Sequence, residues 1–318
     1  MSMRAKAVKG GRAWRIVGVH EPRGPLDFER VLRYQLRQGR EPVDRAHGGR
    51  YRRALRLPGG PSVIEVRPDH PRRTRRLEVA IWGASAAGPD AGAALEQVAD
   101  IYSLAFELPS FHRAAREDRV LDKVVKSLRG LRVARIPDPF EALVWAILGQ
   151  QISVVAASAL KRRLVEELGD TAPAEGEGYA LFPTAARLHA AGEEGLRRLG
   201  LSGPKARYVF SAAEEVATGR LDLEALRNAE SASRTARLLE VRGIGPWSAS
   251  YVGLRAYGDP DALPLADVGL EVAATRAYEA RARLRGAALG RLAEAWRPYR
   301  GWATFYLWYT LLLDQDRI

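Results

Sequence analysis

Residues 239–251 read LEVRGIGPWSASY: an apolar helical run breaks at Gly243-Ile244-Gly245, and Pro246 then opens a second helix. Glycine tolerates turn angles that other residues rarely adopt, and it lets a ligand approach the bare backbone. Proline suits the first position of a helix, because the N–H that it lacks would have no partner there. The stretch therefore predicts two helices joined by a hairpin whose backbone amides, beside a positive helix end, can hold a phosphate.

An acidic residue follows the hairpin a short way along the chain. Residues 263–270 read LPLADVGL, which places Asp267 at the start of the next helical pattern. Aspartate is a favoured helix N-cap, so capping alone would explain a lone acid at this position. A carboxylate in a site emptied of water also stabilises positive charge that develops on a substrate. The two roles are compatible, and we expect Asp267 to serve both.

The hairpin and the acid together resemble the helix-hairpin-helix DNA glycosylases, in which an essential aspartate follows a Gly-x-Gly hairpin. Residues 140–154, FEALVWAILGQQISV, are similar to the opening helix of the DNA-3-methyladenine glycosylase II branch of that family. The resemblance is specific after residue 110 and weak before it. Three shorter segments share it, namely Phe182-Pro183-Thr184, residues 199–201 ahead of residues 205–207, and residues 296–300.

This resemblance implies a mainly α protein with an N-terminal α+β domain and a helix-hairpin-helix DNA glycosylase fold. It implies a monofunctional DNA glycosylase that flips out and removes alkylated bases of the 3-methyladenine and 7-methylguanine type, with Asp267 stabilising the cation that forms on the sugar. Relatives with lyase activity carry a lysine just after the hairpin, where Schiff-base chemistry needs an amine. That position is Trp247 in this chain. We therefore expect hydrolysis by water, with no strand cleavage and no cofactor.

Three aromatic residues are candidates for the base pocket. Tyr251 lies one helical turn after Trp247, so the two share a face, and Trp308 lies in the last helix. The resemblance places such residues around the flipped base, where an aromatic face attracts a cationic alkylated purine by roughly 0.5–2 kcal/mol. The alternative is that these rings simply pack the core, as we expect for the tryptophans at 145, 296 and 302.

Gln150 and Gln151 lie in a turn between two apolar helices. A base must leave the duplex before it is cut, and such enzymes insert a side chain to fill the gap. The resemblance places this side chain at or beside Gln151, where some family members have an apolar residue. A glutamine there can bond the orphaned partner base, whereas helix capping and packing are the alternative for both residues.

The resemblance also implies contacts between the hairpin and the DNA backbone. The amides of Gly243, Ile244 and Gly245 are expected to hold a phosphate, which positions the protein without reading sequence. Arg242 and Lys205 are candidate supporting cations, and Lys205 is expected in a separate loop, as a phosphate contact at most. The hairpin carbonyls could in addition hold a monovalent cation, at Leu239, Val241 and Ile244.

Composition restricts the partners and the chemistry. The chain has 318 residues, a formal net charge of +12 and no cysteine. The basic excess indicates a polyanion, with nucleic acid first and an anionic membrane second, although an arginine-rich coding bias would give the same excess. Disulfides, thiolate zinc sites and iron–sulfur clusters are excluded. With no run of transmembrane length and no signal peptide, we expect a monomer in the cytoplasm or bacterial nucleoid that binds damaged double-stranded DNA and no membrane.

Two domains are expected, a small α+β unit with an antiparallel sheet at residues 1–110 and an all-helical unit with two subdomains at residues 111–318. Residues 171–178 are rich in Gly, Ala, Pro and Glu and predict a loop. The basic runs at 50–53 and 72–76 are expected at the surface, either solvated or against DNA. Strand patterns occur at residues 13–19, 51–57, 62–66 and 77–82.

Two other functions stay open. The same fold could act on uracil, hypoxanthine or an oxidised purine, because the shape of the pocket decides the lesion. A non-catalytic DNA-binding or damage-scanning protein would use the hairpin and the basic surface in salt-sensitive binding and release no base. Release of free base from alkylated DNA distinguishes these functions.

Overall fold

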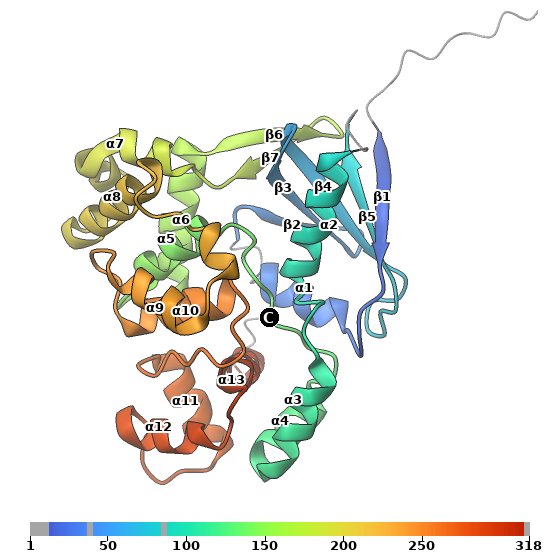
Figure 1. Ribbon diagram of the computed structural model, residues 1–318, viewed down its shortest axis with the longest axis vertical. Helices are drawn as coiled ribbons and strands as arrows, with labels where there is room; N and C mark the ends of the chain where they lie inside the picture. Colours follow the sequence, from blue (N-terminus) through green and yellow to red (C-terminus); the bar gives the residue numbers. More distant parts are fainter. Residues whose placement is uncertain (1–12, 37–40, 84–87, 315–318) are drawn as a thin grey trace, which may run out of the picture.

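A five-stranded antiparallel sheet forms the N-terminal part of the computed structural model, which describes residues 13–36, 41–83 and 88–314 (Figure 1). The strand order is β1-β5-β4-β3-β2, and Leu57 pairs with Gly60 across the tight turn between β3 and β4. The strand patterns in the sequence are confirmed, and β2 is an additional strand. The bounds are β1 (Trp14–His20), β2 (Asp44–His47), β3 (Arg50–Leu57), β4 (Gly60–Pro68) and β5 (Leu77–Trp82).

Two helices accompany this sheet. Helix α2 (Pro89–Ile101) packs against β1, β3 and β5, and it buries Ala94, Val98 and Ile101 along one face, as their helical spacing predicts. Helix α1 (Phe28–Leu36) contacts β2 and buries Tyr34 in its last turn. The expectation of an N-terminal α+β unit is therefore confirmed.

The rest of the described chain is mainly helical, which confirms the expected fold class. In Figure 1, helices α5 to α10 lie on the side opposite the sheet, and α11 and α12 lie below them. The bounds are α3 (Leu108–Ala114), α4 (Arg119–Ser127), α5 (Pro139–Gly149), α6 (Val154–Leu168), α7 (Ala185–Arg198), α8 (Gly203–Ala217), α9 (Ser231–Leu239), α10 (Pro246–Arg255), α11 (Val268–Ala277), α12 (Gly286–Glu294) and α13 (Arg300–Asp314), with 3-10 turns at Ala115–Glu117 and Ala225–Asn228.

The prediction of a loop at residues 171–178 is wrong, and so is the prediction that the C-terminal part is all-helical. A β-hairpin of β6 (Asp170–Ala174) and β7 (Glu177–Leu181) extends from the helices to the sheet (Figure 1). Its inward residues alternate along the strands, but those of β6 are alanines among Gly, Pro and Glu residues typical of a loop, so composition conceals the period of two. They form a second small core with β3 and β4, made of Ala172, Ala174, Tyr179, Leu181, Ala54 and Val63.

The basic run at residues 50–53 also differs from expectation, because its central arginines are buried. Arg52 is 2% exposed, and its Nε donates to Glu65 at 2.5 Å. Arg53 is 5% exposed and pairs with Glu141 of α5. Buried arginines need such carboxylate partners, because an unpaired charge away from water is costly. The Arg53–Glu141 pair therefore ties the sheet to the helical part, whereas the Arg52–Glu65 pair joins two neighbouring strands within the sheet. The exposed arginines at 72–76 remain on the surface, as expected.

A continuous hydrophobic core joins the sheet to the helices. Helix α13 lies within this core, with every residue from Gly301 to Tyr309 buried. Trp145, Trp296 and Trp302 are all buried, as predicted. None of the helices in the described ranges combines the length and the hydropathy that crossing a membrane requires. The division at residue 110 stays a prediction.

Candidate active site

The predicted hairpin joins α9 to α10, and its two glycines have different structural reasons. Gly243 has a φ of +85°, and a Cβ added there would lie 2.2 Å from Cγ of the Tyr208 ring. Only glycine fits at that position. Gly245 has ordinary extended backbone, and none of the described residues comes within 4 Å of a Cβ added to it. The turn therefore closes on the protein at Gly243 and opens to solvent at Gly245.

The first turn of α10 supplies free N–H donors. Pro246 occupies the first helical position, and within the described ranges no side chain caps this helix. Uncapped amides at a helix N-terminus attract anions. Exposed Arg242 lies beside them in the hairpin. The predicted cation at the carbonyls of Leu239, Val241 and Ile244 stays a prediction; the Val241 carbonyl already accepts the Ile244 N–H at 3.0 Å.

Asp267 is half-buried and caps α11, as its position in the sequence suggested. Its Oδ1 accepts the N–H of Leu270 at 2.7 Å and the indole N–H of Trp308 at 2.8 Å. Its Oδ2 accepts the indole N–H of Trp247 at 3.0 Å. Three donors therefore fix both carboxylate oxygens, and the two tryptophans come from elements far apart in the sequence.

The three predicted base-pocket aromatics gather around this carboxylate. The ring centroids of Trp247 and Tyr251 are 5.6 Å apart with planes at 28°, and those of Tyr251 and Trp308 are 6.1 Å apart at 43°. Trp247 is the least buried of the three, whereas Tyr251 and Trp308 are 6% and 9% exposed. The Asp267 carboxylate and the three aromatic rings therefore lie together in one cluster.

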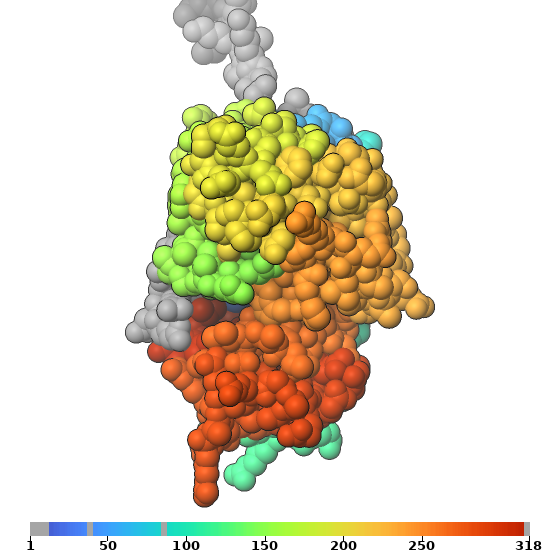
Figure 2. All heavy atoms as spheres, turned by 90° about the vertical axis from the view of Figure 1, so that its left-hand side faces the viewer, coloured from blue at the N-terminus to red at the C-terminus, as the bar shows by residue number. Residues whose placement is uncertain are grey.

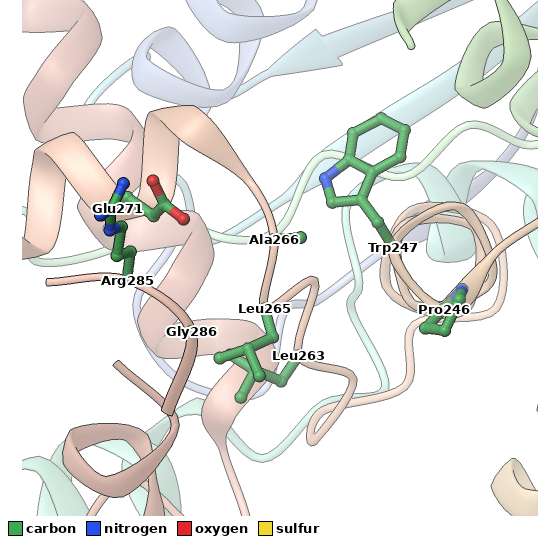
Figure 3. Close-up of a pocket in the computed structure, with 8 residues that line it drawn as sticks. All are labelled: Pro246, Trp247, Leu263, Leu265, Ala266, Glu271, Arg285 and Gly286. Carbon is green, nitrogen blue, oxygen red and sulfur yellow. The ribbon is translucent and has the colours of Figure 1, made fainter. Parts of the chain in front are cut away.

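A groove of about 570 Å³ lies beside Asp267. In Figure 3, the indole of Trp247 extends from α10 toward the backbone at Ala266, the residue before the acid. Glu271, one turn after Asp267, also lines the groove and pairs with Arg283 at 2.9 Å. The full lining consists of Pro246, Trp247, Leu263, Leu265, Ala266, Glu271, Arg285 and Gly286.

The two glutamines of the predicted turn have different environments. Gln150 ends α5, and its Nε2 donates to the Gly243 carbonyl at 2.9 Å and to the Ser248 hydroxyl at 3.1 Å. Its side chain therefore braces the hairpin, and direct DNA binding by Gln150 stays a prediction. Gln151 is exposed, with a φ of +57°, so its side chain is available to fill a gap in a duplex.

Three exposed apolar residues follow Gln151, and the sequence reasoning missed them. Ile152, Val154 and Val155 are 38%, 46% and 49% exposed at the start of α6. Helix α6 itself begins after the Ser153 cap and ends at Leu168, before Gly169. Adjacent apolar positions cannot all lie on one buried helical face, which is the signal that could have identified this patch.

Lys205 does not lie in the predicted loop. It belongs to the first turn of α8, and its ammonium group donates to the carbonyls of Leu148, Gln150 (2.8 Å) and Ile147 (3.4 Å). Burial lowers the pKa of this amine. Lys205 therefore caps the C-terminal end of α5, and the structure does not support a role as a phosphate contact. No group of three or more His, Cys, Asp or Glu in the described chain is arranged for a metal ion.

Known proteins share both parts of this architecture. A family model for the HhH-GPD superfamily base excision DNA repair proteins matches residues 144–298, and a model for the AlkA N-terminal domain matches residues 21–138. The DNA-3-methyladenine glycosylase of Bacillus subtilis (strain 168) is 33% identical over 210 residues, 66% of this chain and 69% of that protein. DNA-3-methyladenine glycosylase 2 of Escherichia coli (strain K12) is 28% identical over 289 residues, 90% of this chain and 94% of that protein.

A solved structure extends the similarity to nearly the whole fold. The 3-methyladenine DNA-glycosylase from Archaeoglobus fulgidus has a TM-score of 0.80 at 25% identity, covering 94% of this chain and 98% of that one. The matches confirm the family resemblance that the hairpin and the acid suggested. The chain therefore belongs to the HhH-GPD superfamily of base excision DNA repair proteins, with an AlkA N-terminal domain, and is a DNA-3-methyladenine glycosylase II-like enzyme.

Proposed function

We propose that this enzyme is a monofunctional glycosylase that hydrolyses the N-glycosidic bond of alkylated bases, of the 3-methyladenine and 7-methylguanine type, in double-stranded DNA. The observation that carries the proposal is the geometry of Asp267, a carboxylate held by two indole N–H groups at the edge of an aromatic pocket. The chemistry of these side chains selects the lesion.

DNA binding begins at the hairpin. The uncapped amides of α10 face open space at Gly245, and a backbone phosphate fits there without displacing a side chain. Figure 2 shows that the start of α6 in green, the hairpin helices in orange and α11 and α12 in deeper orange share one face of the molecule. With a net charge of +12, that face can take a duplex with Gln151 directed at the gap. We propose that the enzyme acts as a monomer.

The flipped base then stacks among Trp247, Tyr251 and Trp308. An alkylated purine such as 7-methylguanine carries a positive charge, and an electron-rich ring attracts it by roughly 0.5–2 kcal/mol. The same faces stack on neutral bases with less discrimination. The pocket therefore favours cationic lesions through electrostatics and tolerates others through stacking.

Bond cleavage moves the glycosidic electron pair onto the departing base and leaves positive charge on C1′ of the sugar. The Asp267 carboxylate stabilises that charge, because its orientation is fixed before the reaction and needs no rearrangement. Three hydrogen bonds already occupy three of its about four lone-pair positions, which leaves about one for a water. We therefore assign Asp267 mainly to electrostatic stabilisation and secondly to orienting the water. Water oxygen bonds to C1′ and loses a proton to solvent, which leaves an abasic site, while the cationic alkylated base departs as a neutral free base.

Among the described residues, the lining of the groove contains no lysine that could supply an amine for lyase chemistry. Trp247 occupies the position that follows the hairpin, and the nearby Lys205 is engaged with three carbonyls of α5. A Schiff base with the sugar needs a free amine next to C1′. The product is therefore expected to be an intact strand with an abasic site.

The test is a set of duplexes with one lesion each: 7-methylguanine, hypoxanthine, uracil, 8-oxoguanine and an undamaged control. We expect free base from the 7-methylguanine duplex at the highest rate, and strand breaks only after alkali. Faster release of another base would assign that lesion instead. Release from none of them, with salt-sensitive binding retained, would leave a DNA-binding protein without glycosylase activity. Breaks without alkali would contradict hydrolysis by water.

A further inference from the structure

Arg255 is a buried cation directly behind the base pocket. It is 3% exposed in the last turn of α10, and within the described chain its guanidinium forms no ion pair. Its Nε donates to the Ala134 carbonyl at 2.7 Å. Its Nη1 donates to two phenol oxygens, that of Tyr34 at 2.9 Å and that of Tyr251 at 3.2 Å. A buried charge is costly unless its N–H groups are hydrogen-bonded, so these neutral acceptors fix the position of the guanidinium.

The two tyrosines belong to different parts of the fold. Tyr251 is a wall of the proposed base pocket, whereas Tyr34 comes from α1 of the N-terminal part, 221 residues from Arg255. The Tyr34 ring is itself held by α13, with its centroid 4.6 Å from that of Phe305 and 6.4 Å from that of Tyr309. One guanidinium nitrogen therefore links the N-terminal part to the pocket wall.

We propose that Tyr34 and Arg255 are positioning residues for base excision, which hold the Tyr251 ring between Trp247 and Trp308. The inference rests on the proposed function, and it assigns to the N-terminal part a contribution to the base pocket. Tyr251 has two rotatable side-chain bonds, about which its ring can change tilt. A hydrogen bond from a fixed guanidinium to its hydroxyl removes that freedom. A flipped base that stacks on a fixed ring presents C1′ to Asp267 at a constant position, and small displacements there are costly to the rate.

The central experiment compares Tyr34→Phe with Tyr309→Phe. Tyr34→Phe keeps the ring and removes the hydroxyl that accepts the Arg255 N–H. Tyr309→Phe removes the hydroxyl of a neighbouring buried ring. That hydroxyl donates to the Arg30 carbonyl at 3.3 Å, and in the described chain it forms no hydrogen bond with Arg255. We expect Tyr34→Phe to lower the single-turnover excision rate on a 7-methylguanine duplex by about three- to tenfold, with duplex affinity unchanged. Tyr309→Phe is expected to change the rate less than about twofold.

A double-mutant cycle separates positioning from a general loss of packing. If Tyr34 acts through Arg255 on the Tyr251 hydroxyl, adding Tyr34→Phe to Tyr251→Phe lowers the rate by less than Tyr34→Phe does alone. Rate losses that multiply fully would overturn the inference. Equal rate losses in Tyr34→Phe and Tyr309→Phe would also overturn it, as would a Tyr34→Phe loss that appears only in duplex affinity.

Wild-type enzyme in the same assay distinguishes this inference from the proposed function. Base release by the wild type with no effect of Tyr34→Phe refutes the positioning role alone. No base release by the wild type refutes the proposed function, and the positioning role is refuted with it. Arg255→Lys is a further check, since a lysine can keep one hydrogen bond to Tyr251 and should retain more activity than Arg255→Met at equal folded fraction.

Discussion

Gly243→Ala and Gly245→Ala should fail in opposite ways, although only one residue separates the two glycines. At Gly243 the φ is +85°, and an added Cβ would lie 2.2 Å from Cγ of Tyr208. The left-handed backbone costs alanine about 1–2 kcal/mol, and displacing a packed ring costs about 1–3 kcal/mol. We therefore expect Gly243→Ala to lower the free energy of unfolding by about 2–5 kcal/mol, measured by urea denaturation.

Gly245→Ala should leave the fold nearly intact and weaken DNA binding. The backbone there is extended, and among the described residues nothing lies within 4 Å of the new methyl group. That methyl would stand where a phosphate approaches the amides. Losing a hydrogen bond to a charged group costs about 1.5–3 kcal/mol, which corresponds to roughly ten- to hundredfold weaker affinity. Titration of a duplex at fixed salt measures it. Wild-type affinity in Gly245→Ala, or wild-type stability in Gly243→Ala, would refute this reasoning.

Three further variants test the surroundings of the site. Trp308→Phe keeps an aromatic wall but removes one N–H from Asp267, so single-turnover excision should fall about tenfold at unchanged duplex affinity; an unchanged rate would show that this hydrogen bond is dispensable. Lys205→Met leaves the α5 carbonyls without their donor and should lower the free energy of unfolding by about 1–3 kcal/mol in urea denaturation; unchanged stability with weaker DNA binding would restore the phosphate-contact assignment. Burial and nearby arginines lower the pKa of His112 from 6.5 to about 4, so the unfolded chain binds the extra proton first and stability falls as pH drops through that interval. His112→Gln should therefore make the free energy of unfolding depend less on pH, by less than about 1 kcal/mol at about pH 5.5 after solvent screening. Urea denaturation at two pH values measures this, and a variant with the wild-type pH dependence would contradict the assignment.

Local features of the site could be predicted from the sequence because each has a local physical cause. The hairpin follows from Gly243 and Pro246, and the cap of α11 follows from Asp267. The shared face of Trp247 and Tyr251 follows from their spacing on one helix. The convergence of Trp247 and Trp308 on the Asp267 carboxylate could be seen only in the tertiary structure, because Trp308 is 41 residues from Asp267.

Other features could not be predicted because their partners are distant or their residues carry weak signals. The buried Arg53 looks like a solvated charge until Glu141, 88 residues away, is placed beside it. Lys205 donates hydrogen bonds to backbone carbonyls, and because every residue has such a carbonyl, the sequence does not show which ones it contacts. Strand β6 buries only alanines, whose alternation is too weak to distinguish from a loop, and Glu177 and Gly178 precede the buried Tyr179 and Leu181 of β7. Sequence patterns therefore reported local geometry, and tertiary packing decided the long-range pairs.

Asp267→Asn provides the most direct test of the central claim, because the amide keeps the shape of the side chain and removes its charge. Losing such a preorganised electrostatic group costs about 2.7–4 kcal/mol of transition-state stabilisation, so release of 7-methylguanine in a single turnover should fall roughly a hundred- to a thousandfold. Duplex affinity should stay at the wild-type value. Glu240→Gln, which removes one exposed negative charge at the end of α9, serves as the control for net charge and should release base normally. Base release by Asp267→Asn at the wild-type rate would contradict the account.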